Sequence, residues 1–198
     1  GLQDKFYRPS RYTETYPLSG SAFWRARDLG ITWKSQHEPV LVYAAVANGL
    51  ALDGRSLGED DSGWMIGNDD NKIDLSSEKE LSAGVGFKYD FDPYGDIELL
   101  AFGLTGDLDE DDLEFLQTQV PRYGQSNNDN RDLWGINAEY DIGEWDLFGQ
   151  VISGRDGEME RFSWYGEISH QFEFEGLRYL NSLRPLVRYG ELDTDLTP

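Results

Sequence analysis

Two stretches of the chain alternate strictly between apolar and polar residues, which is the pattern of a β-strand with two different faces. The apolar positions of the first stretch are Leu81, Ala83, Val85, Phe87, Tyr89 and Phe91. Those of the second stretch are Trp134, Ile136, Ala138, Tyr140 and Ile142. Each stretch has about the length, roughly 9–11 residues, with which a tilted strand crosses a bilayer. The pattern therefore predicts an all-β, antiparallel transmembrane β-barrel or a part of one.

Similar runs elsewhere in the chain raise the expected number of strands to about eight. The expected strand ranges are 24–35, 40–49, 80–91, 96–106, 132–142, 145–154, 162–174 and 183–193. In chain order, the connections between them are short, long, short, long, short, medium and short. The long connections, 52–79 and 107–131, are polar and are expected to be surface loops, and the medium connection is 155–161. Outer-membrane barrels combine short periplasmic turns with longer extracellular loops in this way.

The whole chain, 1–198, is expected to form a single β-barrel domain. We expect an extracellular loop segment at 1–21, strands and loops at 22–193, and the start of a loop at 194–198. If the short turns are periplasmic, both ends of the chain lie on the extracellular side, whereas complete bacterial barrels normally begin and end in the periplasm. The expectation is therefore an internal segment of a larger barrel, and closure as a barrel of about eight strands is the alternative.

Charge and composition narrow the classes of function. The chain has 38 acidic and 17 basic residues and a formal net charge of -21, which argues against nucleic-acid binding because phosphate recognition needs a basic surface. The mean hydropathy of -0.61 does not exclude a barrel, since every second residue of a barrel strand faces water. With no cysteine, the chain has neither disulfides nor thiolate metal sites.

Aromatic residues gather near the ends of the expected strands, where amphipathic rings would sit at the level of lipid headgroups. Members of this candidate girdle include Trp33, Tyr89, Trp134, Tyr140, Trp145, Phe162, Trp164 and Phe172. A soluble β-sandwich is the alternative, because the same rings could pack between two sheets. Strand length and loop asymmetry favour the barrel.

The polar rows opposite the apolar rows would line a water-filled interior, where mixed charges tune the passage of ions. The candidate pore-lining residues are Asp28, Lys34, Lys88, Asp90, Asn137, Glu139, Glu167 and Arg188. Gly84, Gly86 and Gly135 on the same rows would add space or ease curvature. The alternative for each residue is the solvated outer face of a soluble sheet.

Two acidic clusters lie in the long connections, and oxygen-rich loops of this kind suit calcium. The candidate ligands are Asp107, Asp109, Asp111, Asp69 and Asp70. Neither cluster has the EF-hand spacing, so a solvated loop is the favoured interpretation. The pattern of Leu113, Phe115 and Leu116 suggests a short helix that folds inward as a constriction.

Catalytic residues are scarce, and we expect no enzyme. His37 falls in a connector, and His170 shares a strand face with Ile168 and Phe172. Neither histidine has an evident serine nucleophile as a partner. A packing or girdle role is the better interpretation of His170.

Three short motifs resemble strands of the porin O/P family of phosphate- and polyphosphate-selective porins. Arg27–Ile31 (RDLGI) and Tyr43–Gly49 (YAAVANG) are similar to paired strands of that family, and Leu183–Tyr189 (LRPLVRY) is similar to a late strand. The resemblance implies a trimeric channel of about 16 strands in the outer membrane of a Gram-negative bacterium, without a cofactor. Its partners would be the lipid bilayer, lipopolysaccharide and small hydrophilic solutes.

Selectivity does not follow from the resemblance. Anion-selective members line their pores with arginine and lysine, whereas the expected interior here has only Lys34, Lys88 and Arg188 against at least as many acids. Cation-leaning passage through the channel is therefore expected as much as phosphate selectivity.

The leading function is passive diffusion of small hydrophilic solutes or ions. The alternatives are a soluble or surface β-sandwich that binds carbohydrate, and a barrel that forms a scaffold or sheath around a partner protein.

Overall fold

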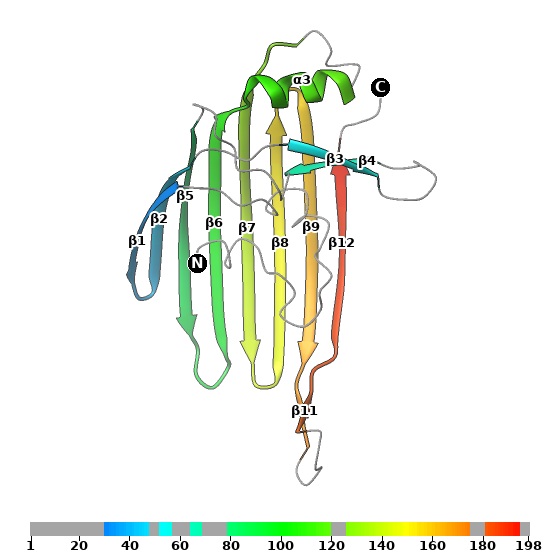
Figure 1. The fold of residues 1–198 in the computed structure, drawn as a ribbon. Helices are drawn as coiled ribbons and strands as arrows, with labels where there is room; N and C mark the ends of the chain where they lie inside the picture. The colour runs from blue at the N-terminus through cyan, green and yellow to red at the C-terminus, as the bar shows by residue number, and fades with distance from the viewer. Residues whose placement is uncertain are drawn as a thin grey trace.

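Eight strands form one antiparallel sheet (Figure 1), in the order β1-β2-β5-β6-β7-β8-β9-β12. This computed structural model describes residues 30–47, 52–56, 64–68, 79–119, 126–174 and 181–194. The strands are β1 Gly30–His37, β2 Val40–Ala47, β5 Glu80–Asp90, β6 Asp96–Asp107, β7 Asn130–Ile142, β8 Trp145–Asp156, β9 Met159–His170 and β12 Leu186–Thr194. Each strand of the sheet pairs with the strand before and after it, so the sheet is an up-and-down meander.

Smaller elements are inserted between the main strands. The short strands β3 Leu52–Ser56 and β4 Trp64–Asn68 pair with each other between β2 and β5. Helix α3, Glu110–Gln119, connects β6 to β7. The two-residue strands β10 Phe172–Glu173 and β11 Ser182–Leu183 extend the connection from β9 to β12.

The structure confirms the all-β antiparallel class and all eight expected main strands, most of them to within a few residues. Within the residues that it describes, the sheet is open, with β1 and β12 at the two edges, and does not close into a barrel. The part of the first expected strand before Gly30 lies outside the described residues. The short helix suggested around Leu116 is present as α3. The prediction of plain surface loops was incomplete, because 52–79 contains β3 and β4.

Two connections differ from the expected pattern. The turn between β8 and β9 consists of Gly157 and Glu158 alone, where a medium loop was expected. The flanking charged residues look like loop in the sequence, but Arg155 pairs with Glu160 across the ladder, and Gly157 has the positive φ of 59° that a tight turn needs. The last connection, expected to be short, instead carries the β10–β11 extension.

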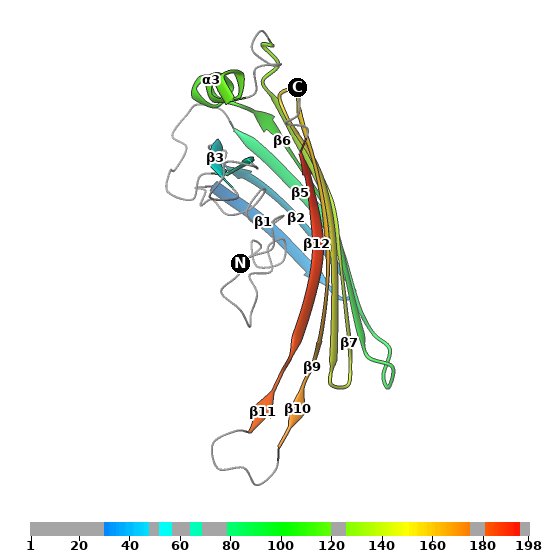
Figure 2. The same ribbon diagram turned by 90° about the vertical axis from the view of Figure 1, so that its right-hand side faces the viewer.

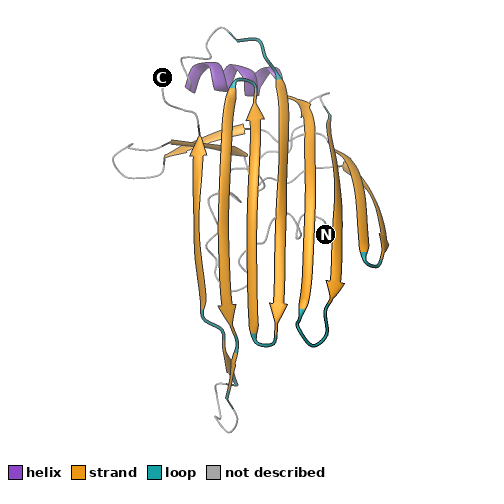
Figure 3. Ribbon diagram, turned by 180° about the vertical axis from the view of Figure 1, so that it is seen from behind, coloured by secondary structure: helices purple, strands orange, loops and turns teal. Residues whose placement is uncertain are grey.

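The sheet is curved, and its two faces have different surroundings. Figure 2 shows α3 and β3 on the concave side of the sheet. Figure 3 shows the sheet from behind, with no helix or strand lying over its convex face. We call the end of the sheet at which α3 lies the upper end.

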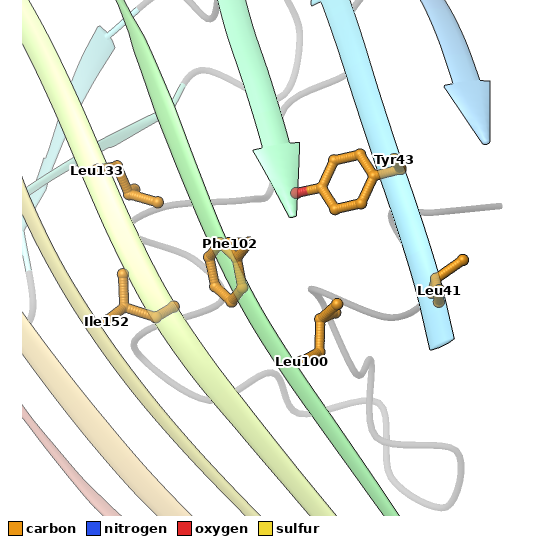
Figure 4. Packing of buried hydrophobic residues seen from close by; sticks show 6 residues of the cluster. All are labelled: Leu41, Tyr43, Leu100, Phe102, Leu133 and Ile152. Carbon is orange, nitrogen blue, oxygen red and sulfur yellow. The ribbon is translucent and has the colours of Figure 1, made fainter. Parts of the chain in front are cut away.

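Buried apolar side chains lie on the concave face in two clusters. The first cluster, shown in Figure 4, comprises Leu41, Tyr43, Leu100, Phe102, Leu133 and Ile152. The second comprises Leu52, Leu108, Leu116 and Met159, and it joins β3 and α3 to the upper end of the sheet. A hydrogen bond strengthens this junction, since the Leu52 N–H donates to the Asp112 carboxylate at 2.9 Å.

Candidate functional site

The convex face carries an apolar band that continues from strand to strand. Strand register aligns its middle row, which from β2 to β8 holds Val42, Val85, Ala101, Ile136 and Val151. The same row continues through Trp164, which was expected in the girdle, to Glu191 on β12. The small and aliphatic side chains of this row lie exposed, with 53% of Val85 and 49% of Ile136 accessible to solvent. The register therefore confirms that the alternating apolar positions share one face and that this face is not sealed between stacked sheets within the described residues.

Aromatic residues border the apolar band at both ends. An upper girdle consists of Trp33, Trp134 and Phe162, which ladder pairing places in one row across the sheet. A lower girdle consists of Tyr89, Tyr140, Trp145 and Phe172, and the ring of Trp145 packs on His170 at a centroid distance of 4.3 Å. Along β7 the band extends from Trp134 to Ile142, about 27 Å at roughly 3.4 Å per residue. That length is of the same order as the apolar band, about 25 Å tall, of transmembrane β-barrels.

A charged row lies directly above the upper girdle on the same face. Asp132 and Arg155 are opposite each other on β7 and β8. Arg155 forms an ion pair with Glu160, and both side chains are more than half exposed. On β7, β8 and β9 the convex face thus changes from apolar to charged within one step of the ladder, whereas on β5 the same row holds the exposed Leu81.

Buried ionic side chains lie on the concave face near its upper end. Arg131 contacts Glu80 at 2.9 Å and Asp156 at 3.0 Å, and Asp156 also pairs with Arg161. All four side chains are at most 5% exposed. These residues, which we call the buried ion network, come from four strands and are formally neutral together. The sequence prediction missed the network because it placed Arg131 in a loop, and only the ladder register brings the four residues together.

Polar residues dominate the lower half of the concave face. Asn137 accepts a hydrogen bond of 2.8 Å from the Gln150 amide. One row below, Glu167 accepts a hydrogen bond of 2.9 Å from Arg188 Nε, and the two form an ion pair. The middle of the face is apolar, so the concave face is not the uniformly polar surface that the alternation predicted.

Three of the glycine positions on this face have no open space above them. At Gly84 and Gly135, a side chain would collide with the rings of Tyr43 and Phe102. At Gly86, a β-carbon would lie 3.3 Å from side-chain atoms of Leu41 and Leu100. These glycines therefore make room for neighbouring side chains rather than for solvent.

Ladder register places the described pore-lining candidates on this one face. Lys34 shares a row with Tyr43, and Lys88, Glu139, Glu167 and Arg188 share another. The side chains of Lys34, Lys88 and Asp90 are exposed, those of Glu139 and Arg188 are half-buried, and those of Asn137 and Glu167 are buried. Asp28 lies outside the described residues.

The acidic residues expected to hold calcium are not gathered into a cluster where the structure describes them. Asp109 caps α3, because its carboxylate accepts the Asp112 N–H at 2.7 Å. Asp107 and Asp111 are exposed, and Asp69 and Asp70 lie outside the described residues.

A different group of carboxylates, which the sequence did not predict, lies at the lower end of the concave face. It comprises Glu139, Asp141 and Asp146, whose ligand atoms all lie within 4.8 Å of one another.

His170 lies among aromatic rings, as its position on the strand predicted. Besides Trp145, its ring contacts Phe172 edge-on at 4.4 Å between centroids.

No helix within the described ranges is both long and apolar enough to span a membrane. No protein-family model matches the chain, and neither does any curated protein or solved structure. The resemblance to the porin O/P family therefore stays a prediction that depends on the quoted motifs.

Proposed function

We propose that the convex face of the sheet lies against the hydrocarbon of a bilayer and that the sheet is part of the wall of a transmembrane β-barrel. The observation that carries the proposal is the register of the exposed face. From β2 to β8 it aligns small and aliphatic side chains in the middle row between aromatic side chains at both borders, and on β7 to β9 a charged row lies beyond the upper border. Transmembrane barrels carry this sequence of zones on their outer surface.

The main alternative for an apolar sheet face is a β-sandwich, in which a second sheet covers it. In the part of the chain that the structure describes, the other two sheets have two strands each. One of them, β3–β4, lies on the concave side with β3 in the second apolar cluster. An uncovered apolar face of this extent is unusual for a soluble monomer, which supports a lipid-facing role.

The open edges of the sheet fit this proposal only if further strands pair with them. The outer backbone groups of β1 and β12 have no ladder partner within the described strands, and hydrocarbon does not tolerate unpaired backbone groups. Additional strands, or strands of another copy, complete the wall in this proposal. A porin-like barrel of about 16 strands in a Gram-negative outer membrane, assembled as a trimer, is the form that the sequence resemblance implies.

The polar lower half of the concave face supports a channel for small hydrophilic solutes or ions. Lys88 and Asp90 are exposed there, and acidic residues outnumber basic ones in the two lowest rows. Such a lining favours cations over anions. We therefore propose passive, cation-leaning diffusion rather than phosphate selectivity.

Lipid contact and conduction are tested separately. In vesicles containing brominated lipids, fluorescence of a variant that retains Trp134 as its only tryptophan should be quenched, because Trp134 is 54% exposed on the convex face. In a matched variant, the tryptophan is placed instead at Gln150 on the concave face, which is 3% exposed, and it should be quenched far less. Equal quenching of both variants, or a protein that stays soluble without detergent, would overturn the bilayer proposal.

Conduction is measured with the full-length protein in planar bilayers under a KCl gradient. Stepwise conductance with a reversal potential shifted toward that of K⁺ is the expected result. A protein that inserts but never conducts would overturn the channel function while leaving the barrel in place. That outcome would favour a scaffold or sheath.

A further inference from the structure

A hollow of about 690 Å³ lies at the upper border of the apolar band. Its residues come from β7, β8, β9 and β12, and most of them occupy convex-face positions in the ladders. Ligand sites in proteins usually have volumes of roughly 300–1,000 Å³. The hollow is therefore of the size that holds a small organic molecule or part of a larger one.

Two aromatic residues line the hollow from opposite sides. Trp134 on β7 and Phe162 on β9 share one ladder row, with the small Ser153 of β8 between them. Of Trp134, 54% is accessible to solvent, and of Phe162, 44%. Because neighbouring strands lie about 4.8 Å apart, the two aromatic residues leave the sheet roughly 10 Å from each other. A ring held between them lies about 5 Å from each, which is a normal distance for stacked rings.

Four charged side chains form the rim of the hollow: Asp132, Arg155, Glu160 and Asp193. Arg155 donates to Glu160 at 2.5 Å, and the Asp132 carboxylate accepts from the Thr105 hydroxyl at 2.7 Å. An arginine has five N–H donors and a carboxylate has about four acceptor sites, so these contacts leave capacity for a ligand. Three carboxylates and one guanidinium give the rim a formal charge of two negative units. The rim therefore disfavours phosphate but offers both donors and acceptors to neutral hydroxyl groups.

The lower side of the hollow opens onto the apolar band. On β7 and β8, the next convex residues toward the middle of the sheet are Ile136 below Trp134 and Val151 below Ser153. Both aliphatic side chains are exposed, Ile136 to 49% and Val151 to 37%. A ligand with its polar ring in the hollow thus has the band available for an alkyl chain. This continuity favours an amphiphile over a soluble ligand, because a soluble ligand makes no use of the band.

We infer that the hollow binds the neutral sugar headgroup of a membrane glycolipid, with the sugar ring between Trp134 and Phe162. The C–H groups on the faces of a sugar ring are attracted to the negative faces of aromatic rings. The hydroxyl groups at its edge both donate and accept hydrogen bonds, which the charged rim supplies. The inference depends on the proposed contact of the convex face with a bilayer, which places the hollow at the level of the headgroups, and it adds a specific lipid partner.

The test compares three probes: octyl glucoside, tetraethylene glycol monooctyl ether, which has the same chain without the sugar, and glucose, which has no chain. Each is titrated below its micelle concentration into the full-length protein, kept in solution by an amphipathic polymer. Binding is followed by the fluorescence of the variant that retains Trp134 alone, because Trp134 lines the hollow, and by calorimetry of the wild type. Octyl glucoside should bind saturably, and each of the other probes should bind more weakly by about tenfold or more.

Two substitutions within the hollow are matched by one outside it. Ser153→Leu fills the space between the two rings and should weaken octyl glucoside binding by about tenfold or more. Phe162→Leu removes one ring and should weaken it about two- to tenfold, the worth of one stacked ring. Ser35→Leu makes the same change as Ser153→Leu at another half-buried serine, in the middle row next to Val42, and should bind as the wild type does.

Several results would overturn the site. Equal binding of the two octyl probes removes the sugar, and glucose that binds as tightly as octyl glucoside removes the glycolipid. Equal binding by Ser153→Leu and Ser35→Leu removes the hollow. The inference and the bilayer proposal fail separately, because lipid contact is read from quenching in vesicles, whereas headgroup binding is read from the difference between probes without a bilayer.

Discussion

The ring of Tyr43 on β2 lies directly over Gly84, its ladder partner on β5. A β-carbon added to Gly84 would come within 2.8 Å of Tyr43 Cζ and 2.9 Å of the Ala101 carbonyl oxygen. Phe102 covers Gly135 on β7 in the same way. Glycine and aromatic residues therefore alternate along one row of the concave face, where the ring of each aromatic residue fills the space above the neighbouring glycine.

Replacing Gly84 with alanine tests this packing. We expect Gly84→Ala to lower the free energy of unfolding by about 1–3 kcal/mol, the usual cost of overpacking. The measurement is thermal or denaturant unfolding followed by circular dichroism. Gly149→Ala is the matched control, because nothing lies within 4 Å of an added β-carbon there. If the ring of Tyr43 is the obstacle, Tyr43→Ala combined with Gly84→Ala should cost less than the sum of the two changes.

The buried ion network makes a contrasting prediction for two arginines near the upper end of the sheet. Arg131→Met should cost about 3–5 kcal/mol, because it removes the buried ion pairs with Glu80 and Asp156 and leaves Arg161 as the one remaining arginine of the network. Arg155→Met should cost less than about 1 kcal/mol, because its pair with Glu160 is exposed to solvent. Both are measured by denaturant unfolding, and similar losses for the two variants would contradict the burial of the network.

Leu116 packs helix α3 against the sheet and is 2% exposed in a cluster with Leu52 and Met159. We expect Leu116→Ala to destabilise this junction by about 2–5 kcal/mol and to open the helix to proteolysis. Glu114→Ala, on the exposed side of the same helix, should change stability by less than about 0.5 kcal/mol. Equal protease resistance of the two variants would show that α3 does not depend on this cluster.

Alternation in the sequence was sufficient to predict the eight strands of the main sheet, but not the short strands β3 and β4. In the strictly alternating stretches it also predicted which residues share a face. Residues such as Val85 and Ile136 lie on the exposed convex face because side-chain direction in a strand depends only on the two-residue period. The same pattern did not predict the open sheet, because it contains no information on how the edges β1 and β12 are completed.

Features that depend on pairing between strands could not be predicted in this way. The Glu139, Asp141 and Asp146 cluster and the buried ion network need the register of several ladders, which the sequence does not specify before the turns are known. The tight turn at Gly157 was missed because ionic residues on both sides suggested a solvated loop. The apolar middle of the concave face was missed because Tyr43 and Phe102 cover glycines that were assigned to open space.

The lipid-facing role of the convex face makes the sharpest prediction at Ile136. In water, Ile136→Arg at a position that is 49% exposed would change stability by less than about 0.5 kcal/mol. In a bilayer, an arginine near the midplane of a barrel wall costs about 2–4 kcal/mol, and the cost falls to about 0–1 kcal/mol near the interface. Thr105→Arg is the matched control, because Thr105 belongs to the charged row opposite Asp132.

The two variants are compared by reversible unfolding from lipid vesicles, with the wild type as reference. We expect Ile136→Arg to lose at least about 1 kcal/mol more than Thr105→Arg, the smallest difference between midplane and interface positions. Both replacements add the same side chain to an exposed strand position. A difference of that size therefore reports what surrounds the apolar band, and not a general effect of arginine on the folding of the sheet. Equal stabilities would mean that water, rather than lipid, meets the convex face.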